Sequence, residues 1–408
     1  MSDLIVVGAG LTGLFAAALA ARRGARVTLI AAGRGGLELS HGCIDILGPS
    51  PLLQGLEDLP TDHPYQRAGA PALQAALVAL QEMAQEDGLP YVGGLTSTLL
   101  LPTTLGALHP TSLAPEAQAA GDLSSDAEVS LAGLPAFRDA SAPLTATALE
   151  RQGVRVTAVL ELPLIDAPLR RDAYATDLAR LFDDPDRRAE IARAWKPRVA
   201  GLRRVGVPAV LGWERHAQAF DDLQERLGVR LFEIPTPPPC VPGLRLERLL
   251  RRAAQSAGAL LIEGSRAAGL VDGRSGGRRV SGVVAFTAGG PRVYSAQGVL
   301  LASGGVLHGG LLARSDGRVQ ESVLDLPVRA PADRTAWTSA AWSDPQPYAR
   351  FGLRVNARMQ PIGADGSVPY ENVCAAGGVL AGVDRALEGS RQGIDLASAL
   401  RAVEVLTA

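Results

Sequence analysis

The 408-residue sequence is poor in the residues that define several protein classes. It has three cysteines, Cys43, Cys240 and Cys374, and no Cys-x-x-Cys pair. This argues against an iron–sulfur cluster, a structural zinc or a disulfide framework held by this chain alone, and favours a reducing cytoplasm. Aromatic residues make up 4% and the formal net charge is −2, so we expect no nucleic-acid surface. The 47% of hydrophobic residues suffices for a sizeable core and excludes disorder.

Leu4–Ala21 is the one uncharged apolar run long enough to suggest a membrane span or a signal peptide. Asp3 precedes it where a signal peptide carries positive charge, and three glycines interrupt it. We therefore interpret the run as a buried strand, a tight turn and a helix, and we expect no direct membrane span.

The glycines follow the pattern Gly8-x-Gly10-x-x-Gly13, after a strand at Leu4–Val7 and before an Ala/Leu-rich helix. In this pattern the glycines allow a tight turn, close approach of the backbone to a pyrophosphate, and close packing of helix on strand. The helix N-terminus then offers unpaired N–H groups to a phosphate. In this context the motif predicts a dinucleotide- or flavin-binding site, against the alternative of a chance Gly-rich turn.

An acidic residue that would hold an adenosine ribose is expected at the end of the second strand. The sequence there reads Ala31, Ala32, Gly33 and Arg34, which disfavours ordinary FAD or NAD binding. Arg34 is compatible with a phosphate, either of a shorter flavin or of NADP; the alternative is a solvated arginine.

The fold class expected is α/β, a discontinuous Rossmann-like flavin-binding domain with an inserted α+β cap domain. Residues 1–92 and 238–408 are assigned to the flavin domain and residues 93–237 to the cap or substrate domain. A Pro-rich stretch at Pro235–Pro239 marks the second boundary.

Several segments in consistent order resemble the fumarate reductase/succinate dehydrogenase type of flavoprotein, and within it the B-type subunit of anaerobic glycerol-3-phosphate dehydrogenase. Two segments resemble flavin turns, Leu301–Gly305 and Asn372–Gly378 with Glu388–Gly393. The others are Ser40–Leu47, His63–Tyr65, Leu101–Thr111, Gly133–Asp139, Pro235–Arg245 and Gly378–Gly389.

The resemblance implies a flavoprotein subunit that takes part in oxidation of glycerol 3-phosphate to dihydroxyacetone phosphate, with electrons passing to the quinone pool. It implies two partners, a catalytic FAD subunit and an iron–sulfur, membrane-associated subunit. The chain itself would lie in the cytoplasm at the inner face of the membrane. FMN is the implied cofactor, bound non-covalently, with FAD as the alternative; FMN has no adenosine, which agrees with the missing ribose acid.

Residues expected to bind the flavin come from six short segments. They are Gly8, Ala9, Gly10, Leu11, Thr12, Gly13, Ala31, Ala32, Gly33, Arg34, Ser40, His41, Gly42, Ser303, Gly304, Gly305, Ala376, Gly377, Gly389, Ser390, Gly393 and Ile394.

If the chain itself oxidises an alcohol, it needs a base and cations for the phosphate. His109 and His41 are the candidate bases, and Arg245 and Arg138 the candidate anion binders, since a guanidinium matches phosphate in bidentate fashion. A structural ion pair is the alternative for either arginine. His41 is also the position at which a covalent histidyl–flavin bond is conceivable, a pocket-lining role being the alternative.

Other histidines are interpreted differently. His63 and His216 are expected to be structural or solvated, and His308 is a residue that could line the flavin. Arg391 and Gln392 stand where the family commonly has small residues beside the flavin.

Three functions remain open. The first is the electron-transfer subunit that the resemblance implies. The second is a self-sufficient fumarate-reductase-type flavin enzyme acting on a small anionic substrate. The third is a non-catalytic nucleotide-binding assembly subunit; an NADP oxidoreductase would leave the C-terminal flavin motif unexplained.

Overall fold

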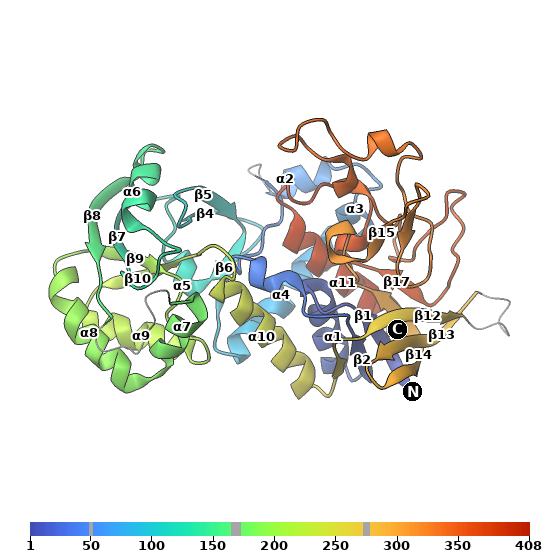
Figure 1. Cartoon of the computed structure of the whole chain (residues 1–408), viewed down its shortest axis with the longest axis horizontal. Coiled ribbons are helices and arrows are strands. Elements are labelled where there is room, and N and C mark those ends of the chain that lie inside the picture. The colour runs from blue at the N-terminus through green and yellow to red at the C-terminus, as the bar shows by residue number, and fades with distance from the viewer. Residues whose placement is uncertain (49–51, 165–172, 272–277) are drawn as a thin grey trace. The chain divides into compact units, whose positions relative to one another are not determined.

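The computed structural model describes residues 1–48, 52–164, 173–271 and 278–408. These residues form two compact units (Figure 1). Unit 1 comprises Met1–Gly36, Asp45–Leu80 and Leu250–Ala408, and unit 2 comprises Leu37–Ile44 and Gln81–Leu249. The α/β fold class expected from the sequence is confirmed. The domain boundaries at 92/93 and 237/238 stay a prediction.

Unit 1 is built on a seven-stranded sheet in the order β11-β2-β1-β14-β13-β12, with β17 also paired to β14. The strands are β1 (Ser2–Val7), β2 (Val27–Ile30), β11 (Leu260–Ile262), β12 (Arg266–Val271), β13 (Val280–Thr287), β14 (Gly290–Leu301) and β17 (Val373–Ala375). Strands β11, β2, β1, the end of β14 and β17 are parallel, whereas β12, β13 and the start of β14 are antiparallel. The carboxyl ends of β1, β14 and β17 therefore meet at one edge, where Rossmann-like folds bind nucleotides.

The strands β1 and β2 form because their apolar residues are buried on both faces, as a central parallel sheet requires. The helix between them, α1 (Leu11–Arg22), is buried over all but its last residue and packs against α11 (Arg391–Leu406). The apolar run Leu4–Ala21 is thus a strand, turn and helix. In the part of the chain that is described, no helix is both apolar and long enough to cross a membrane.

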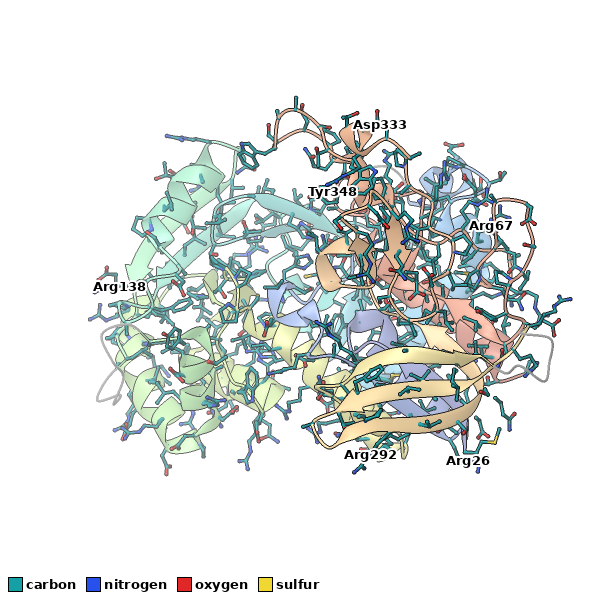
Figure 2. The ribbon with its side chains drawn as sticks, turned by 45° about the vertical axis from the view of Figure 1, so that its right-hand side comes forward. Arg26, Arg67, Arg138, Arg292, Asp333 and Tyr348 are labelled. Carbon is teal, nitrogen blue, oxygen red and sulfur yellow. The ribbon has the colours of Figure 1, made fainter. Side chains whose placement is uncertain are left out.

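The remaining elements of unit 1 are short, apart from α4 and α10, which run into unit 2. The helices are α2 (Leu52–Glu57), α3 (Pro64–Ala68), α4 (Ala70–Glu86) and α10 (Val241–Ser256), and the strands are β15 (Leu311–Ala313) and β16 (Val319–Glu321). The 3-10 turns are Gly36–Leu39, Val306–His308, Arg334–Ala336, Pro347–Arg350 and Gly377–Val379. Of the turn Gly36–Leu39, only Gly36 belongs to unit 1. Figure 2 shows the antiparallel part of the sheet, with Arg292 of β14 at its edge.

Unit 2 contains a four-stranded parallel sheet in the order β10-β9-β7-β8. Its strands are β7 (Glu128–Gly133), β8 (Arg155–Glu161), β9 (Arg204–Pro208) and β10 (Arg230–Ile234). Two antiparallel pairs, β3 (Tyr91–Gly93) with β6 (Leu113–Pro115) and β4 (Leu99–Pro102) with β5 (Leu108–Thr111), supply the antiparallel component. Its helices are α5 (Glu116–Ala119), α6 (Ala142–Glu150), α7 (Ala175–Asp183), α8 (Pro185–Val199) and α9 (His216–Leu227).

The core of unit 2 lies where α7, α8 and α9 pack together and against the sheet. Phe182 and Trp195 are fully buried with ring centroids 5.7 Å apart. The indole N–H of Trp195 donates to the carbonyl of Pro163 at 2.8 Å, so the one polar group of that ring is satisfied.

Candidate functional site

The Gly-rich turn of unit 1 is held by two positions that tolerate no side chain. Gly8 has φ +116°, and a Cβ there would lie 2.2 Å from the carbonyl oxygen of Ala302. A Cβ on Gly13 would lie 1.9 Å from the carbonyl oxygen of Gly8. The amide of Ala302 in turn donates to Val7 at 2.9 Å. Gly8 therefore packs directly on the end of β14, and the first turn of α1 packs directly on Gly8.

Gly10 differs from these two glycines because a side chain there would point into open space. It precedes α1 with an extended backbone and lends no side chain to cap the helix. A Cβ built on Gly10 meets no atom within 4 Å. The first N–H groups of a helix have no partner within that helix, so the turn offers donors and room for a phosphate.

No acidic side chain stands directly at the end of β2, where the sequence reads Ala31 to Arg34. Ala31 is buried, its amide donates to Ile262 and its carbonyl accepts from the amide of Ser265, both at 2.9 Å. Ala32, Gly33 and Arg34 are exposed. The next residue, Gly35, approaches the turn so closely that a Cβ would lie 2.4 Å from the carbonyl oxygen of Ala9. Backbone therefore occupies part of the region beside Ala9.

The turns after β14 and β17 lie beside the start of α1. The amide of Ala376 donates to Leu301 at 2.9 Å. Gly377 has φ +71°, and a Cβ there would lie 2.1 Å from Oγ1 of Thr12. A Cβ on Gly305 would lie 2.9 Å from the carbonyl oxygen of Gly378. Unit 1 thus brings together predicted site residues from both ends of the chain, Gly8 to Gly13 with Ser303 to Gly305, Ala376 and Gly377.

The start of α11 is fixed by a tyrosine that the sequence did not single out for a role. The Tyr65 hydroxyl donates to Ile46 at 2.5 Å and lies 3.4 Å from the carbonyl oxygen of Ser390. A Cβ on Gly393 would lie 2.1 Å from that hydroxyl, so only glycine fits. Burial, with Glu388 next, raises the pKa of Tyr65 well above its ordinary value and keeps the phenol neutral.

The turn before α11 and the buried His63 also fix the start of this helix. Gly389 has φ +67° in the turn that precedes α11, and Ile394 lies buried in its first turn. His63 is buried, accepts from the Tyr65 amide through Nδ1 and faces Glu388 with Nε2 at 3.3 Å. Burial favours a higher pKa for Glu388, but hydrogen bonds from His63 and Ser390 outweigh it and lower this pKa. His63 is structural, as the sequence analysis expected.

An ion pair of the half-buried Arg385 with the buried Asp395 lies beside the glycine turns, and sequence reasoning missed it. The Nη1 of Arg385 lies 2.7 Å from Oδ1 of Asp395, and Thr12 also hydrogen-bonds to Asp395. Burial raises the pKa of Asp395, with Arg385 and Thr12 opposing. Partial desolvation and then Arg385 and Arg391 lower the pKa of His308. The sequence feature that could have indicated this pair is Asp395, an acidic residue among the small apolar residues of the last helix.

Ser40, His41 and Gly42 belong to unit 2, where His41 lies beside His109. Their ring centroids are 4.5 Å apart. The Nδ1 of His41 accepts from the Cys43 amide at 3.1 Å, so Nε2 carries the proton of the neutral ring. Gln118, which is buried, donates to the carbonyl of His41 at 2.9 Å. These hydrogen bonds fix the loop that contains His41, and the two candidate bases lie side by side.

Gly42 is fixed from two sides within the same unit. Its carbonyl accepts from the buried Tyr91 hydroxyl at 2.6 Å. It has φ +82°, and a Cβ would lie 2.8 Å from Cβ of Pro242. The hydroxyl of Ser40 accepts from the Gly42 amide at 3.2 Å.

Arg245 does not have the environment of a substrate-binding arginine. It is 4% exposed, and its guanidinium forms a bidentate pair with Glu233 at 2.6 and 3.1 Å. Its Nε and Nη2 both donate to the carbonyl of Gly212. Burial favours a higher pKa for Glu233, but Arg245 outweighs it and holds this pKa below its ordinary value. These contacts correct the anion-binding expectation for Arg245 and give it a structural role.

Arg138 has the opposite environment. It is exposed at the outer edge of unit 2, with its side chain directed away from the ribbon (Figure 2). Its role as an anion binder stays a prediction.

His216 lies in the same buried network and makes the stability of the protein depend on pH. Its Nδ1–H donates to Leu211 at 2.8 Å, and burial, with Arg245 next, lowers its pKa from 6.5 to about 4. The unfolded chain therefore takes up this proton below pH 6.5 while the folded chain does not, so stability falls as pH drops from 6.5 towards 4.

We expect wild type to lose about 2 kcal/mol more unfolding free energy than His216→Asn between pH 7 and pH 4.5. The asparagine keeps a donor for Leu211 but does not titrate. Urea unfolding of both proteins at the two pH values measures the difference; equal losses would contradict the buried, neutral imidazole.

The residues of unit 1 fit a flavin. Among the described residues, the Ser303 hydroxyl oxygen is buried at the glycine turns and has no hydrogen-bond partner. A buried hydroxyl without a partner is costly, and a ligand polar group would satisfy it. Together with the open space beside Gly10, it provides for a phosphate and for a polar organic group at one edge of the sheet.

Comparison with known proteins shows the family of the chain. Residues 3–394 match the family described as FAD binding domain. The B-type subunit of anaerobic glycerol-3-phosphate dehydrogenase from Yersinia pseudotuberculosis is 31% identical over 98% of this chain and 97% of its own length. The probable B-type subunit from Halobacterium salinarum is 31% identical over 97% and 96%, and that from Pectobacterium atrosepticum 29% over 98% and 97%. The chain therefore belongs to the FAD-binding-domain flavoproteins, in the family of the B-type subunit of anaerobic glycerol-3-phosphate dehydrogenase.

Proposed function

We propose that this chain is the flavin subunit of a glycerol-3-phosphate dehydrogenase and relays electrons from glycerol 3-phosphate, which becomes dihydroxyacetone phosphate, towards the quinone pool. The observation that carries the proposal is the meeting of the Gly8–Gly13 turn with the Ser303 and Gly377 turns in unit 1. The substrate in this proposal is taken from the names of the relatives, which include glycerol-3-phosphate dehydrogenase. The proposed partners are a catalytic FAD subunit and an iron–sulfur subunit that holds the complex at the cytoplasmic face of the membrane.

Different residues of unit 1 would bind different parts of the cofactor. The turn at Gly10 and the first N–H groups of α1 would bind a phosphate. The Ser303 hydroxyl and the N-terminus of α11 would face the polar part of the ring and its side chain. The flavin supplies reversible uptake of two electrons, and the positive end of α11 favours an anionic reduced ring.

The charged side chains nearby add to this field. Arg385 is held by Asp395, and Arg391 lies close enough to lower the pKa of His308. Around His308, Arg385 and Arg391 act against the carboxylate of Asp395. Positive charge near a flavin raises its reduction potential, which suits an acceptor of electrons from an alcohol.

FMN is the flavin that we propose, with FAD as the alternative that the family description favours. Ala31 ends β2 where an FAD site commonly has a ribose-binding acid, and both of its backbone groups are already paired. Gly35 leaves little room beside Ala9. A flavin with one phosphate needs neither an acid nor an adenosine pocket at this position.

A self-sufficient flavin enzyme is the second candidate, and the His41–His109 pair favours it. Two imidazoles with centroids 4.5 Å apart can pass a proton between a substrate and solvent. In this alternative His109 or His41 is the base, and Arg138 assists substrate binding.

Flavin identity tests both proposals. We expect the purified chain to hold one flavin, and acid precipitation to release FMN, identified by chromatography, from a colourless pellet. Glycerol 3-phosphate should bleach the bound flavin only after the other two subunits are added.

Each other outcome has a distinct meaning. Released FAD would contradict the FMN assignment, and colour kept in the pellet but lost in His41→Ala would show a covalent link. Bleaching of the isolated chain would favour the second candidate. Failure to bind either flavin would overturn both redox functions and leave the assembly-subunit hypothesis.

A further inference from the structure

Gln392 has a buried polar atom that the protein does not satisfy. It is the second residue of α11, and its side chain is 6% exposed. Its Oε1 is buried and has no hydrogen-bond partner in the described structure. An unpaired amide oxygen at such a site costs on the order of 1–3 kcal/mol, so it calls for a partner that the described residues do not supply.

The backbone at Gln392 is held on both sides, so the position of its side chain is set by the fold. The next residue, Gly393, donates to the carbonyl of Asp45 at 2.9 Å and packs on the Tyr65 hydroxyl. The amide of Ser390, two residues earlier, donates to Arg385 at 3.1 Å.

The face of α11 that carries Gln392 points to the glycine turns. Residues three apart on a helix share a face, and Asp395 is three residues after Gln392. Asp395 hydrogen-bonds to Thr12, and its Oδ1 would lie 2.7 Å from a Cβ on Gly377. Gln392 lies one turn before Asp395, and helical side chains lean towards the N-terminus of their helix. The Gln392 side chain is therefore directed towards the end of the contact between α1 and α11.

The chemistry of the unpaired atom restricts its partner. An amide oxygen accepts hydrogen bonds only, so the partner must carry an N–H or O–H group. An ionised phosphate offers only acceptor oxygens and therefore cannot pair with this amide oxygen. The pyrimidine edge of an isoalloxazine offers an N–H between two carbonyls, which a carboxamide matches with its oxygen and its NH2 group.

We propose that Gln392 binds the pyrimidine edge of the flavin, Oε1 accepting from ring N3–H and Nε2 donating to an adjacent carbonyl. This inference rests on the proposed flavin function. It makes Gln392 a positioning residue for the cofactor.

The test compares Gln392→Leu with wild type and with Gln255→Leu, a control on the exposed face of α10. Titration of the apo full-length chain with FMN and with FAD gives the dissociation constants, and thermal unfolding gives apo stability. We expect Gln392→Leu to weaken binding of the preferred flavin about tenfold or more. Its apo melting temperature should be unchanged or higher, because the unpaired oxygen is gone.

A Gln392→Glu variant gives a second readout. The added negative charge should lower the midpoint potential of bound flavin relative to wild type, because it disfavours the reduced anion. A lower apo melting temperature with unchanged flavin affinity and potential would overturn the proposal and assign Gln392 a packing role. Failure of wild type itself to bind flavin would instead overturn the proposed function.

Discussion

Gly13→Ala is expected to abolish flavin retention and to lower the unfolding free energy by about 3 kcal/mol. The new Cβ would lie 1.9 Å from the carbonyl oxygen of Gly8 and 3.5 Å from Cβ of Ala302. The first of these neighbours is backbone within the turn after β1, so relief requires the first turn of α1 to move away from Gly8. Urea unfolding of the apo protein and the flavin content after purification measure the two effects.

Gly10→Ala is the matched control because it changes the same turn in open space. A Cβ there meets no protein atom within 4 Å, so we expect apo stability to change by less than about 1 kcal/mol. Flavin affinity should still fall at least about tenfold, because the methyl group enters the space through which backbone approaches a phosphate. Wild-type affinity in this variant would contradict the phosphate site; wild-type stability in Gly13→Ala would contradict the packing.

Arg245→Ala is expected to destabilise the protein by about 3–5 kcal/mol, because it leaves Glu233 buried and unpaired. Glu233 is 1% exposed and also accepts from the Leu211 amide at 2.8 Å. The variant also removes two hydrogen bonds to the carbonyl of Gly212. The midpoint and slope of urea unfolding give the change.

Two comparisons separate the buried pair from a general effect of removing arginine. Arg155→Ala removes one partner of the exposed pair of Arg155 with Glu128, 2.9 Å apart, and should cost less than about 1 kcal/mol. Arg245→Met combined with Glu233→Gln should recover at least half of the loss of Arg245→Met alone, because no charge stays buried. If Arg245→Ala leaves stability intact and instead impairs substrate binding, its structural assignment is wrong.

The flavin turns of unit 1 could be predicted because their signal is local. Gly8 and Gly13 are required by a strand, a turn and a helix that follow one another in the chain. The apolar run Leu4–Ala21 likewise placed β1 and α1 close to their observed bounds.

The roles of single charged residues could not be predicted in this way. Arg245 has the residue type of a phosphate ligand, yet it pairs with Glu233 of β10 because the sheet and α10 bring the two together. Asp395 meets Thr12 only after α11 packs against α1. Both depend on which faces of separate elements meet, and residue spacing carries no information on that.

The sequence by itself determined the family, the α/β class and the glycine turns expected to hold a flavin, because each depends on short contiguous patterns or on their order along the chain. The tertiary structure alone decided that the Arg245 guanidinium is occupied, that a Cβ at Gly13 has no room while one at Gly10 does, and that Oε1 of Gln392 is buried without a partner among the described residues. The physical reason is that packing, desolvation and hydrogen-bond satisfaction are properties of neighbours in space, and those neighbours come from segments far apart in the chain.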